Sequence, residues 1–235
     1  MKIAAHRGAS SLAPENTISA FKKAAEIGCE WIEIDVQLTQ DNVPVVIHDQ
    51  TVNRCTNGTG IVAETNLKEL KVLDAGLWFN ESFRGETIPT LEETLQLANT
   101  HNLHINIELK IYPGDDVILL CDKVNQVINS ATLPLSSILF SSFDISAIKY
   151  LHRTQPNVKR GQLWEKIPHD AVSHLKEIDA FSAHCDYRYL EEEQAKKIKQ
   201  ENYKICCYTA NIPAHVEPHK SWGVDMVFSD MPQIY

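Results

Sequence analysis

Short runs of apolar, β-branched residues alternate along this chain with amphipathic segments of helical period. This alternation is typical of a parallel sheet built from strand–helix–strand units. The number of predicted strands is that of a barrel, so we expect an α/β fold of the (β/α)₈ TIM-barrel type. The predicted strands are Lys2 to Ala5, Trp31 to Gln37, His104 to Leu109, Ser137 to Ser141, Lys159 to Leu163, Ala180 to Ala183, Lys204 to Tyr208 and Asp225 to Phe228.

The helices between these strands are marked by capping residues. Asn16 is a suitable N-cap for the first helix, and Thr90 with Glu93 forms a capping box ahead of a second. Asp144 caps a third, and a further helix is expected from about Leu190 to Gln200. Apolar residues at helical spacing from Val117 to Ile128 predict another, and a short helical pattern lies near Leu67 to Leu73. The apolar positions of these segments recur at helical spacing, so we assign them to the core and not to function.

The alternation breaks once, between His48 and Pro89, in a stretch that is rich in turn residues. This stretch is too small for an independent domain. We therefore predict a single domain over residues 1–235, with an insertion of about residues 50–89 after the second strand. Its expected apolar anchors are Trp78, Phe79 and Phe83.

The chain ends shortly after its last predicted strand, at Tyr235, and leaves no room for a closing helix. One stretch of the barrel wall must then be covered by something else. We predict that this wall is an association surface, such as a homodimer contact.

Composition narrows the class of protein. The chain has 235 residues, of which 43% are hydrophobic and 23% charged, as in ordinary soluble enzymes. Its apolar runs are shorter than the ~20 residues of a membrane helix, and His6 and Arg7 come too early for a signal peptide, so we expect a cytoplasmic protein without a membrane anchor. The net charge of -9 argues against nucleic acid as a partner. The six cysteines lack metal-site spacing and are expected to be reduced thiols.

Acidic residues alternate with apolar ones in two neighbouring strands. "WIEIDVQL" places Glu33 and Asp35 on one face, and "INIELK" places Glu108 on the equivalent face. Both faces of a helix-covered parallel sheet are normally apolar, so in a barrel these acids must point inward. Three converging carboxylates suit one hard divalent cation, Mg²⁺ or Ca²⁺.

An alternative without a metal pairs these acids with Arg7 and Lys110 in a salt-bridge network. Buried ionic clusters contribute little stability, which disfavours this alternative. A substrate phosphate that bridges the cation, Lys110 and Arg7 would use all of these groups.

Two histidines follow short apolar runs: His6 comes directly after the first predicted strand, in "HRGAS", and His48 comes directly after Val45, Val46 and Ile47, in "VPVVIHDQ". A pair of imidazoles beside a metal site matches general acid–base cleavage of a phosphoester, because one takes a proton from the nucleophile and the other protonates the leaving oxygen. Gly8 is expected to let the backbone approach the ligand closely. His184, at the end of the sixth predicted strand, is a candidate for lining the same site.

Two other chemistries remain open at this point. Zinc ligation by His6, His48 and His184 is conceivable, although the carboxylates outnumber what a closed zinc site needs. Ser141 and Ser142 end a predicted strand, but no Gly-x-Ser-x-Gly elbow is present to make either a nucleophile.

Motifs along nearly the whole chain resemble the glycerophosphodiester phosphodiesterase family, and its short soluble bacterial-type members in particular. The stretches that carry the resemblance are "HRGASSLAPENTISAF" (6–21), "EIDVQLTQDNVPVVIHD" (33–49), "TNGTG" (56–60), "IPTLEETL" (88–95), "NIELK" (106–110), "YTAN" (208–211) and "GVDMVFSDMP" (223–232).

The resemblance implies a (β/α)₈ barrel that hydrolyses small-molecule glycerophosphodiesters to glycerol 3-phosphate and an alcohol. It implies catalysis through a cyclic phosphate, with a neighbouring glycerol hydroxyl as nucleophile. Carried over residue by residue, the acid–base pair is His6 and His48, the phosphate ligands are Arg7 and Lys110, and Mg²⁺ or Ca²⁺ is bound by Glu33, Asp35 and Glu108. The chain departs from the family at Tyr208, where members commonly carry Trp; the change adds a hydroxyl at the mouth.

Two further functions compete with this one. A lysophospholipase D would need an apolar approach surface, for which the insertion's Trp78, Phe79 and Phe83 are candidates. A catalytically silent phosphate-binding module is disfavoured because both histidines and all three acids are present.

Overall fold

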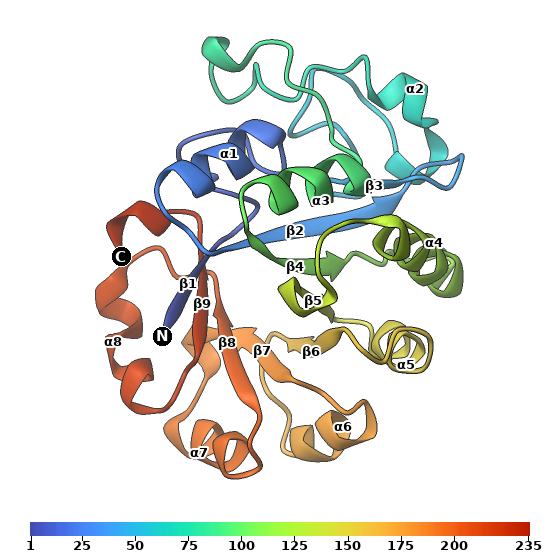
Figure 1. Cartoon of the computed structure of the whole chain (residues 1–235). Helices are drawn as coiled ribbons and strands as arrows, with labels where there is room; N and C mark the ends of the chain where they lie inside the picture. The colour runs from blue at the N-terminus through green and yellow to red at the C-terminus, as the bar shows by residue number, and fades with distance from the viewer.

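Eight parallel strands close into a barrel in the computed structural model, which describes residues 1–235 (Figure 1). Strand β1 pairs in parallel with both β2 and β9, and this double pairing closes the sheet. The predicted (β/α)₈ fold is confirmed. The barrel strands are β1 (Lys2–Ala5), β2 (Trp31–Leu38), β4 (His104–Leu109), β5 (Ile138–Ser142), β6 (Lys159–Trp164), β7 (Ser182–Asp186), β8 (Lys204–Tyr208) and β9 (Met226–Ser229).

A ninth strand, β3 (Pro44–Val46), lies outside the barrel and pairs antiparallel with the end of β2. The hydrophobic pattern did not predict this strand, because the apolar run it belongs to is short. It matters for the site because it carries the chain directly into His48.

Helices surround the barrel, one after most strands (Figure 1). Two of them, α6 and α8, were not predicted: α6 is short, and α8 contains Pro218 and has a mixed polar face. The helices are α1 (Ile18–Glu26), α2 (Leu67–Leu70), α3 (Leu91–Thr100), α4 (Val117–Ser130), α5 (Ile145–Thr154), α6 (Ala171–Glu177), α7 (Glu192–Gln200) and α8 (Pro213–Ser221), with 3₁₀ turns η1 (Val62–Glu64), η2 (Glu81–Phe83), η3 (Leu135–Ser137), η4 (Tyr187–Tyr189) and η5 (Pro232–Ile234).

The cap of α1 differs from the prediction. The N-cap is Thr17, whose side chain accepts a hydrogen bond from the backbone of Ala20. Asn16 is buried in the left-handed conformation, with φ 55°, and its amide donates to Asp35 Oδ2 at 2.9 Å. Asparagine suits both roles, so the pattern alone did not separate them. The predicted caps of α3 and α5 are confirmed.

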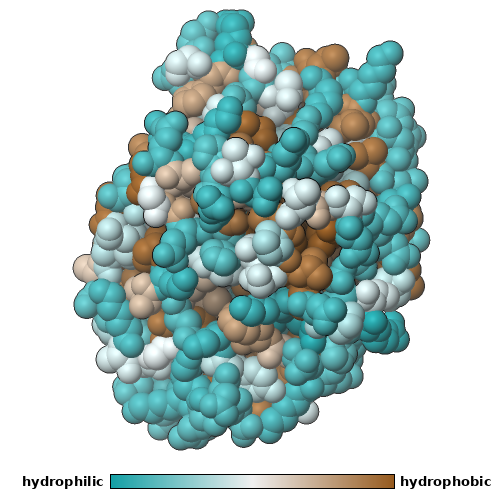
Figure 2. Space-filling model, in the orientation of Figure 1, coloured by the Kyte–Doolittle hydropathy of each residue, from teal (hydrophilic) through white to brown (hydrophobic).

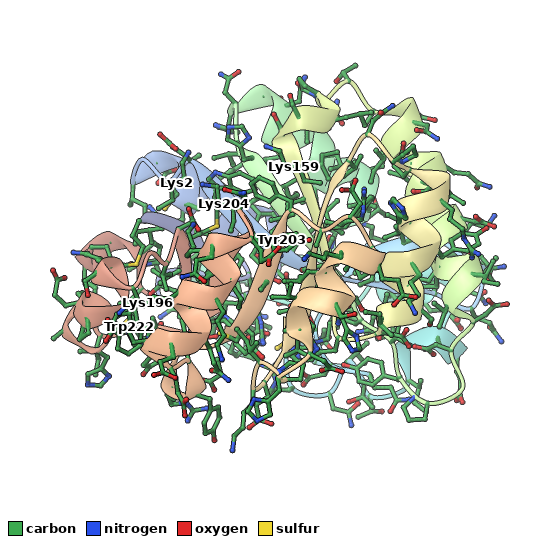
Figure 3. All side chains as sticks on the ribbon, turned by 90° about the horizontal axis from the view of Figure 1, so that it is seen from below. Lys2, Lys159, Lys196, Tyr203, Lys204 and Trp222 are labelled. Carbon is green, nitrogen blue, oxygen red and sulfur yellow. The ribbon has the colours of Figure 1, made fainter.

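The apolar faces of the strands pack against the helices, and the polar faces of β2 and β4 point into the barrel. Ile32, Ile34, Ile105 and Ile107 belong to the largest core cluster, between the barrel and helices α1, α3, α4 and α5. A smaller cluster that includes Trp31 and Phe228 fills the barrel interior. Lysines at the first positions of three strands mark the N-terminal end of the barrel, as Figure 3 shows for Lys2, Lys159 and Lys204.

The insertion between β3 and α3 has an aliphatic core of its own. The predicted aromatic anchors lie outside this core: Trp78 is 39% exposed, and the ring of Phe79 packs edge to face against both Trp78 and Phe83. These edge-to-face contacts cover part of each aromatic ring, although the rings do not belong to the buried core of the insertion. The buried residues are Val45, Ile47, Val52, Val62, Leu70, Ala75 and Ile88.

After β9 the chain forms only the turn η5, which contacts β1, and no further α-helix. The hydroxyl of Tyr235 donates to the carbonyl of Ala210 at 2.8 Å. The association surface expected at this wall stays a prediction.

Candidate active site

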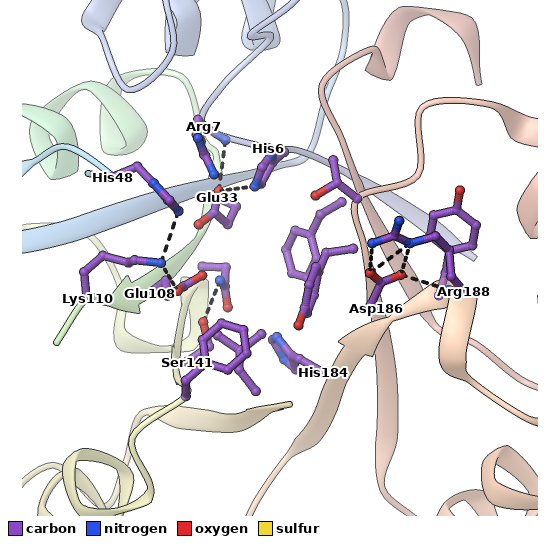
Figure 4. A pocket seen from close by; sticks show the side chains of 17 residues that line it. His6, Arg7, Glu33, His48, Glu108, Lys110, Ser141, His184, Asp186 and Arg188 are labelled. Carbon is purple, nitrogen blue, oxygen red and sulfur yellow. Dashed lines mark hydrogen bonds and ion pairs between the residues drawn. The ribbon is translucent and has the colours of Figure 1, made fainter. Parts of the chain in front are cut away.

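A cavity of about 490 Å³ opens at the carboxyl ends of the barrel strands. Active sites of this fold lie at that end of the barrel. Figure 4 shows two groups of polar side chains across the cavity from each other, with Asp186 and Arg188 forming the second group. The first group contains sequence-predicted residues, namely His6, Arg7, Glu33, His48, Glu108 and Lys110.

The three predicted acids come together on β2 and β4. Asp35 and Glu108 are register partners, and ligating oxygens of Glu33, Asp35 and Glu108 lie within 4.8 Å of one another. Burial, followed by repulsion from the neighbouring carboxylates, raises the pKa of Glu33 and of Glu108. Burial also disfavours ionised Asp35, but Arg7, His48 and Lys110 outweigh it and lower the pKa of Asp35.

This cluster fits a hard divalent cation. Its donors are all carboxylate oxygens, and Glu33 Oε1 is buried without a hydrogen-bond partner. The salt-bridge alternative accounts for part of the charge, since Lys110 Nζ lies 2.7 Å from Glu108 Oε1 and Arg7 Nε lies 3.3 Å from Asp35 Oδ2. It leaves Glu33 Oε1 unpaired. A cation at this place would pair that oxygen and reduce the repulsion.

His6 is oriented by a carboxylate that the sequence analysis did not assign to the site. Its Nδ1 lies 2.6 Å from Oδ1 of Asp230, which follows β9. Since a carboxylate only accepts, Nδ1 carries the proton and Nε2 is left to face Glu33 Oε2, 4.0 Å away. Burial opposes ionisation of Asp230, but hydrogen bonds from His6, Asn211 and Ser10 lower its pKa to about 2.

His48 has the same arrangement with a different partner. Its Nδ1 lies 2.8 Å from Asp49 Oδ1, and Lys110 Nζ donates to its Nε2 at 3.2 Å. Burial, followed by the charges of Arg7 and Lys110, lowers the pKa of His48 despite the nearby carboxylates. The amide of Gln37 donates to the backbone carbonyls of residues 47–49, which fixes the loop that carries the imidazole.

Arg7 turns back from β1 in the left-handed conformation, with φ 55°. Its backbone N–H donates to Glu33 Oε2 at 2.9 Å and its Nη1 to Glu15 Oε1 at 2.8 Å. Gly8 was expected to let the backbone approach a ligand, but the structure gives another reason for a glycine here. A Cβ at this position would lie 2.7 Å from the backbone of Ala20. Gly8 therefore allows the turn to pack against α1, and its missing side chain does not face the cavity.

His184 lines the floor of the cavity. The strand that carries it, β7, runs to Asp186, so His184 lies within the strand and not at its end as predicted. Its Nε2 is 2.8 Å from Ser182 Oγ, and its Nδ1 is buried without a partner. Burial lowers its pKa to about 3. Gly161 makes room for the ring, since a Cβ there would be 2.4 Å from His184 Nε2.

The zinc alternative finds no support. Glu33, Asp35 and Glu108 form the chain's one group of three potential ligands, and His6, His48 and His184 do not form a second. Ser141 also lines the cavity, where its hydroxyl accepts from the amide of Asn106.

Aromatic residues form the rim on the side of β5 and β8. Tyr208 lines the cavity as predicted, but its hydroxyl donates to the carbonyl of Trp164 at 2.8 Å and is not free at the mouth. Phe143 is 51% exposed, and its ring packs edge-on against Tyr208. Asp186 and Arg188, which the sequence analysis missed, form an ion pair opposite the histidines.

A model of the glycerophosphoryl diester phosphodiesterase family matches residues 6–234, a range that contains every residue of the site. The chain belongs to this family. It is 36% identical over 235 residues to the glycerophosphodiester phosphodiesterase of Caldanaerobacter subterraneus subsp. tengcongensis, with 98% of this chain and 94% of that relative covered. A Bacillus subtilis glycerophosphodiester phosphodiesterase is 32% identical over 246 residues, with 98% and 84% covered.

Solved structures of the family have the same fold. An Oleispira antarctica phosphodiesterase, in complex with its product sn-glycerol-3-phosphate, is 34% identical and has a TM-score of 0.95, over 100% of this chain and 94% of that one. A glycerophosphodiester phosphodiesterase from Agrobacterium tumefaciens is 27% identical and has a TM-score of 0.81, over 100% and 98%. The resemblance noted from the motifs is confirmed, and so is the prediction that this chain is a phosphodiesterase-family enzyme.

Proposed function

We propose that this family member hydrolyses glycerophosphodiesters to glycerol 3-phosphate and an alcohol, with His6 and His48 as its acid–base pair. One observation carries the proposal: two imidazoles, each with a carboxylate on Nδ1, line one cavity together with Glu33 and Glu108, whose ligating oxygens lie within 4.8 Å of an oxygen of Asp35. The Oleispira relative, bound to sn-glycerol-3-phosphate, supports the assignment of the product.

Glu33, Asp35 and Glu108 would hold one divalent cation, Mg²⁺ or Ca²⁺. Bound there, such an ion supplies positive charge that polarises the phosphoryl group and stabilises the developing negative charge. The protein's share is the placement of three oxygen ligands on two adjacent, rigid strands.

Arg7 and Lys110 hold the phosphate. Both side chains line the cavity, where Arg7 pairs with Glu15 and Asp35 and Lys110 pairs with Glu108 and Asp35. A guanidinium and an ammonium beside the acids leave N–H donors for phosphate oxygens. These two cations orient the phosphorus for attack and offset the charge of the diester.

The two histidines move the protons. In each, the carboxylate fixes the proton on Nδ1, so Nε2 is the atom that exchanges a proton with the reacting oxygens. One Nε2 takes the proton of the neighbouring glycerol hydroxyl as that oxygen bonds to phosphorus, and the other, protonated beforehand, gives its proton to the leaving alcohol, which leaves a cyclic phosphate. Water then attacks the cyclic phosphate with the two histidine roles exchanged, which yields glycerol 3-phosphate and restores both histidines. His6 follows β1 and His48 follows β3. In the proposed mechanism they act on opposite sides of one phosphorus.

Lysophospholipids are the second candidate substrate. The observation in favour is the aromatic stack of Trp78, Phe79 and Phe83 at the surface of the insertion. Figure 2 shows hydrophobic residues on the displayed face as separate patches among hydrophilic ones, with no single broad apolar surface. None of the helices has the length and apolar character required to cross a bilayer.

The test compares glycerophosphocholine with lysophosphatidylcholine, with release of glycerol 3-phosphate or its acylated form as the readout. We expect turnover of the soluble diester in the presence of Mg²⁺ or Ca²⁺, and its loss in His6→Ala and His48→Ala. A preference for the acylated substrate would establish the second candidate instead. Binding of glycerol 3-phosphate without turnover of either would indicate a silent phosphate-binding module.

A further inference from the structure

The guanidinium of Arg54, in the loop after β3, donates hydrogen bonds to two carboxylates through all three of its nitrogens. Its Nε and Nη2 donate to Asp49 Oδ2 and Oδ1 at 2.7 and 2.9 Å. Its Nη1 and Nη2 donate to Glu15 Oε2 and Oε1, both at 2.8 Å. Both pairs are therefore bidentate, which is the arrangement in which a guanidinium imposes the most geometry on its partners.

Each of these carboxylates also forms a hydrogen bond with a residue of the candidate site. Asp49 Oδ1 lies 2.8 Å from His48 Nδ1, and Glu15 Oε1 accepts from Arg7 Nη1 at 2.8 Å. A continuous chain of hydrogen bonds thus runs from one imidazole to one guanidinium. Arg54 stands at its centre.

We propose that Arg54 is a positioning residue that holds His48 and Arg7 in fixed relation to each other. The inference rests on the roles given to these two residues in the proposed function. Arg54 itself does not line the cavity, so it acts through Asp49 and Glu15 and does not touch the substrate.

The burial of the two carboxylates shows why they need this partner. The side chain of Asp49 is 31% exposed, so without Arg54 it is free to turn toward water and release His48 Nδ1. Glu15 is only 13% exposed, and hydrogen bonds from Arg54 and Arg7 lower its pKa against the opposing effect of burial. Loss of Arg54 would leave Glu15 with Arg7 alone, which would draw the guanidinium toward Glu15 and away from phosphate.

Lysine cannot replace the guanidinium here. A single ammonium has three donors on one atom and cannot form two planar, bidentate pairs at once. Arg54 is 44% exposed, and partly exposed ion pairs contribute little to stability. The contribution of Arg54 to catalysis should therefore exceed its contribution to folding.

The experiment uses the full chain with Arg54→Gln, Arg54→Lys and Arg54→Ala. The matched control is Arg84→Gln, because Arg84 belongs to the same insertion and pairs only with Glu81 three residues away. For glycerophosphocholine we expect kcat/KM to fall roughly 10- to 100-fold in all three Arg54 variants, with Arg54→Lys no better than Arg54→Gln. Arg84→Gln should behave as the wild type.

Two readouts separate positioning from a structural role. Millimolar guanidinium should restore part of the activity of Arg54→Ala, whereas NaCl at equal ionic strength should not. In ¹H–¹⁵N spectra the Nδ1–H signal of His48, assigned from its absence in His48→Ala, should be protected from exchange in the wild type and lost in Arg54→Gln.

Full activity in Arg54→Lys would overturn the proposal, because charge alone would then suffice. An unchanged His48 signal in Arg54→Gln would overturn it too. A different result would contradict the proposed function alone. If the wild type hydrolyses no glycerophosphodiester but shows the predicted His48 signals, the positioning role of Arg54 stands and the proposed activity is wrong.

Discussion

His6 and Asp230 form a hydrogen-bonded pair, Nδ1 to Oδ1 at 2.6 Å, although 224 positions separate them in the sequence. The closure of the barrel brings them together, since β1 pairs with β9 and the backbone N–H of His6 donates to the carbonyl of Ser229. Against the opposing effect of burial, hydrogen bonds from His6, Asn211 and Ser10 lower the pKa of Asp230 to about 2, so its carboxylate is ionised at neutral pH. The orientation of one proposed acid–base residue therefore depends on the last strand.

Asp230→Asn should lower kcat for glycerophosphodiester hydrolysis by roughly 10²- to 10⁴-fold, with little change in KM. An amide offers either a donor or an acceptor to Nδ1 and stabilises a charged imidazole far less than a carboxylate does. Steady-state kinetics check this. Asp225→Asn, a control at the other end of the barrel where Asp225 pairs with Lys199 and Lys204, should keep the wild-type kcat. Equal losses in both variants would contradict the specific role of Asp230.

The sequence predicted the barrel and most of the site because both leave local patterns. The alternation in β2 and β4 placed Glu33, Asp35 and Glu108 on one face, and each histidine of the pair followed a short apolar run. Residues that orient them were not predicted, since Asp230 meets His6 only across the closed barrel and Arg54 meets Glu15 only across 39 positions of the chain. No periodicity within one segment records such contacts.

Errors in element boundaries had the same origin. Residues 180–183 looked like a strand because they are largely apolar, yet β7 extends through the polar His184 and Asp186. Polar residues inside a barrel strand end an apolar pattern without ending the strand. The true boundary moved His184 from the mouth to the cavity floor.

Divalent cations should raise the thermal unfolding midpoint of the wild type. A cation bound by the three acids relieves their repulsion, and a ligand at 100 times its Kd stabilises the folded state by about 2.7 kcal/mol. Differential scanning calorimetry with Mg²⁺, Ca²⁺ or chelator measures the effect. Glu33→Gln should abolish most of the shift, whereas Glu81→Gln, on the exposed insertion, should not. An equal shift in both variants would place the cation elsewhere.

Gly161→Ala should lower the free energy of unfolding by about 1–3 kcal/mol, because the new methyl group would overlap the imidazole of His184 and the hydroxyl of Ser182. Urea denaturation measures the change. Ser182→Ala removes the same hydroxyl without adding bulk and should cost about 1 kcal/mol. A Gly161→Ala variant as stable as the wild type would show that the ring of His184 has room to move aside.

His184→Gln should reduce kcat less than about 10-fold, while KM for the diester rises. With a pKa of about 3, His184 is neutral at assay pH and cannot supply a proton to the leaving group. Its Nδ1 and the Oδ1 of Asn106 are unpaired polar atoms of the cavity lining, available to a bound ligand. A kcat loss as large as that of His48→Ala would instead make His184 part of the proton-transfer machinery.

The proposed function is metal-dependent hydrolysis by the His6 and His48 pair. Its most direct test measures glycerol 3-phosphate released from glycerophosphocholine by the wild type, with Mg²⁺, with Ca²⁺ and with chelator, beside His6→Ala and His48→Ala. We predict release that requires a divalent cation and falls at least about 10²-fold in each variant. Release that persists in chelator, or in either histidine variant at the wild-type rate, would contradict the account.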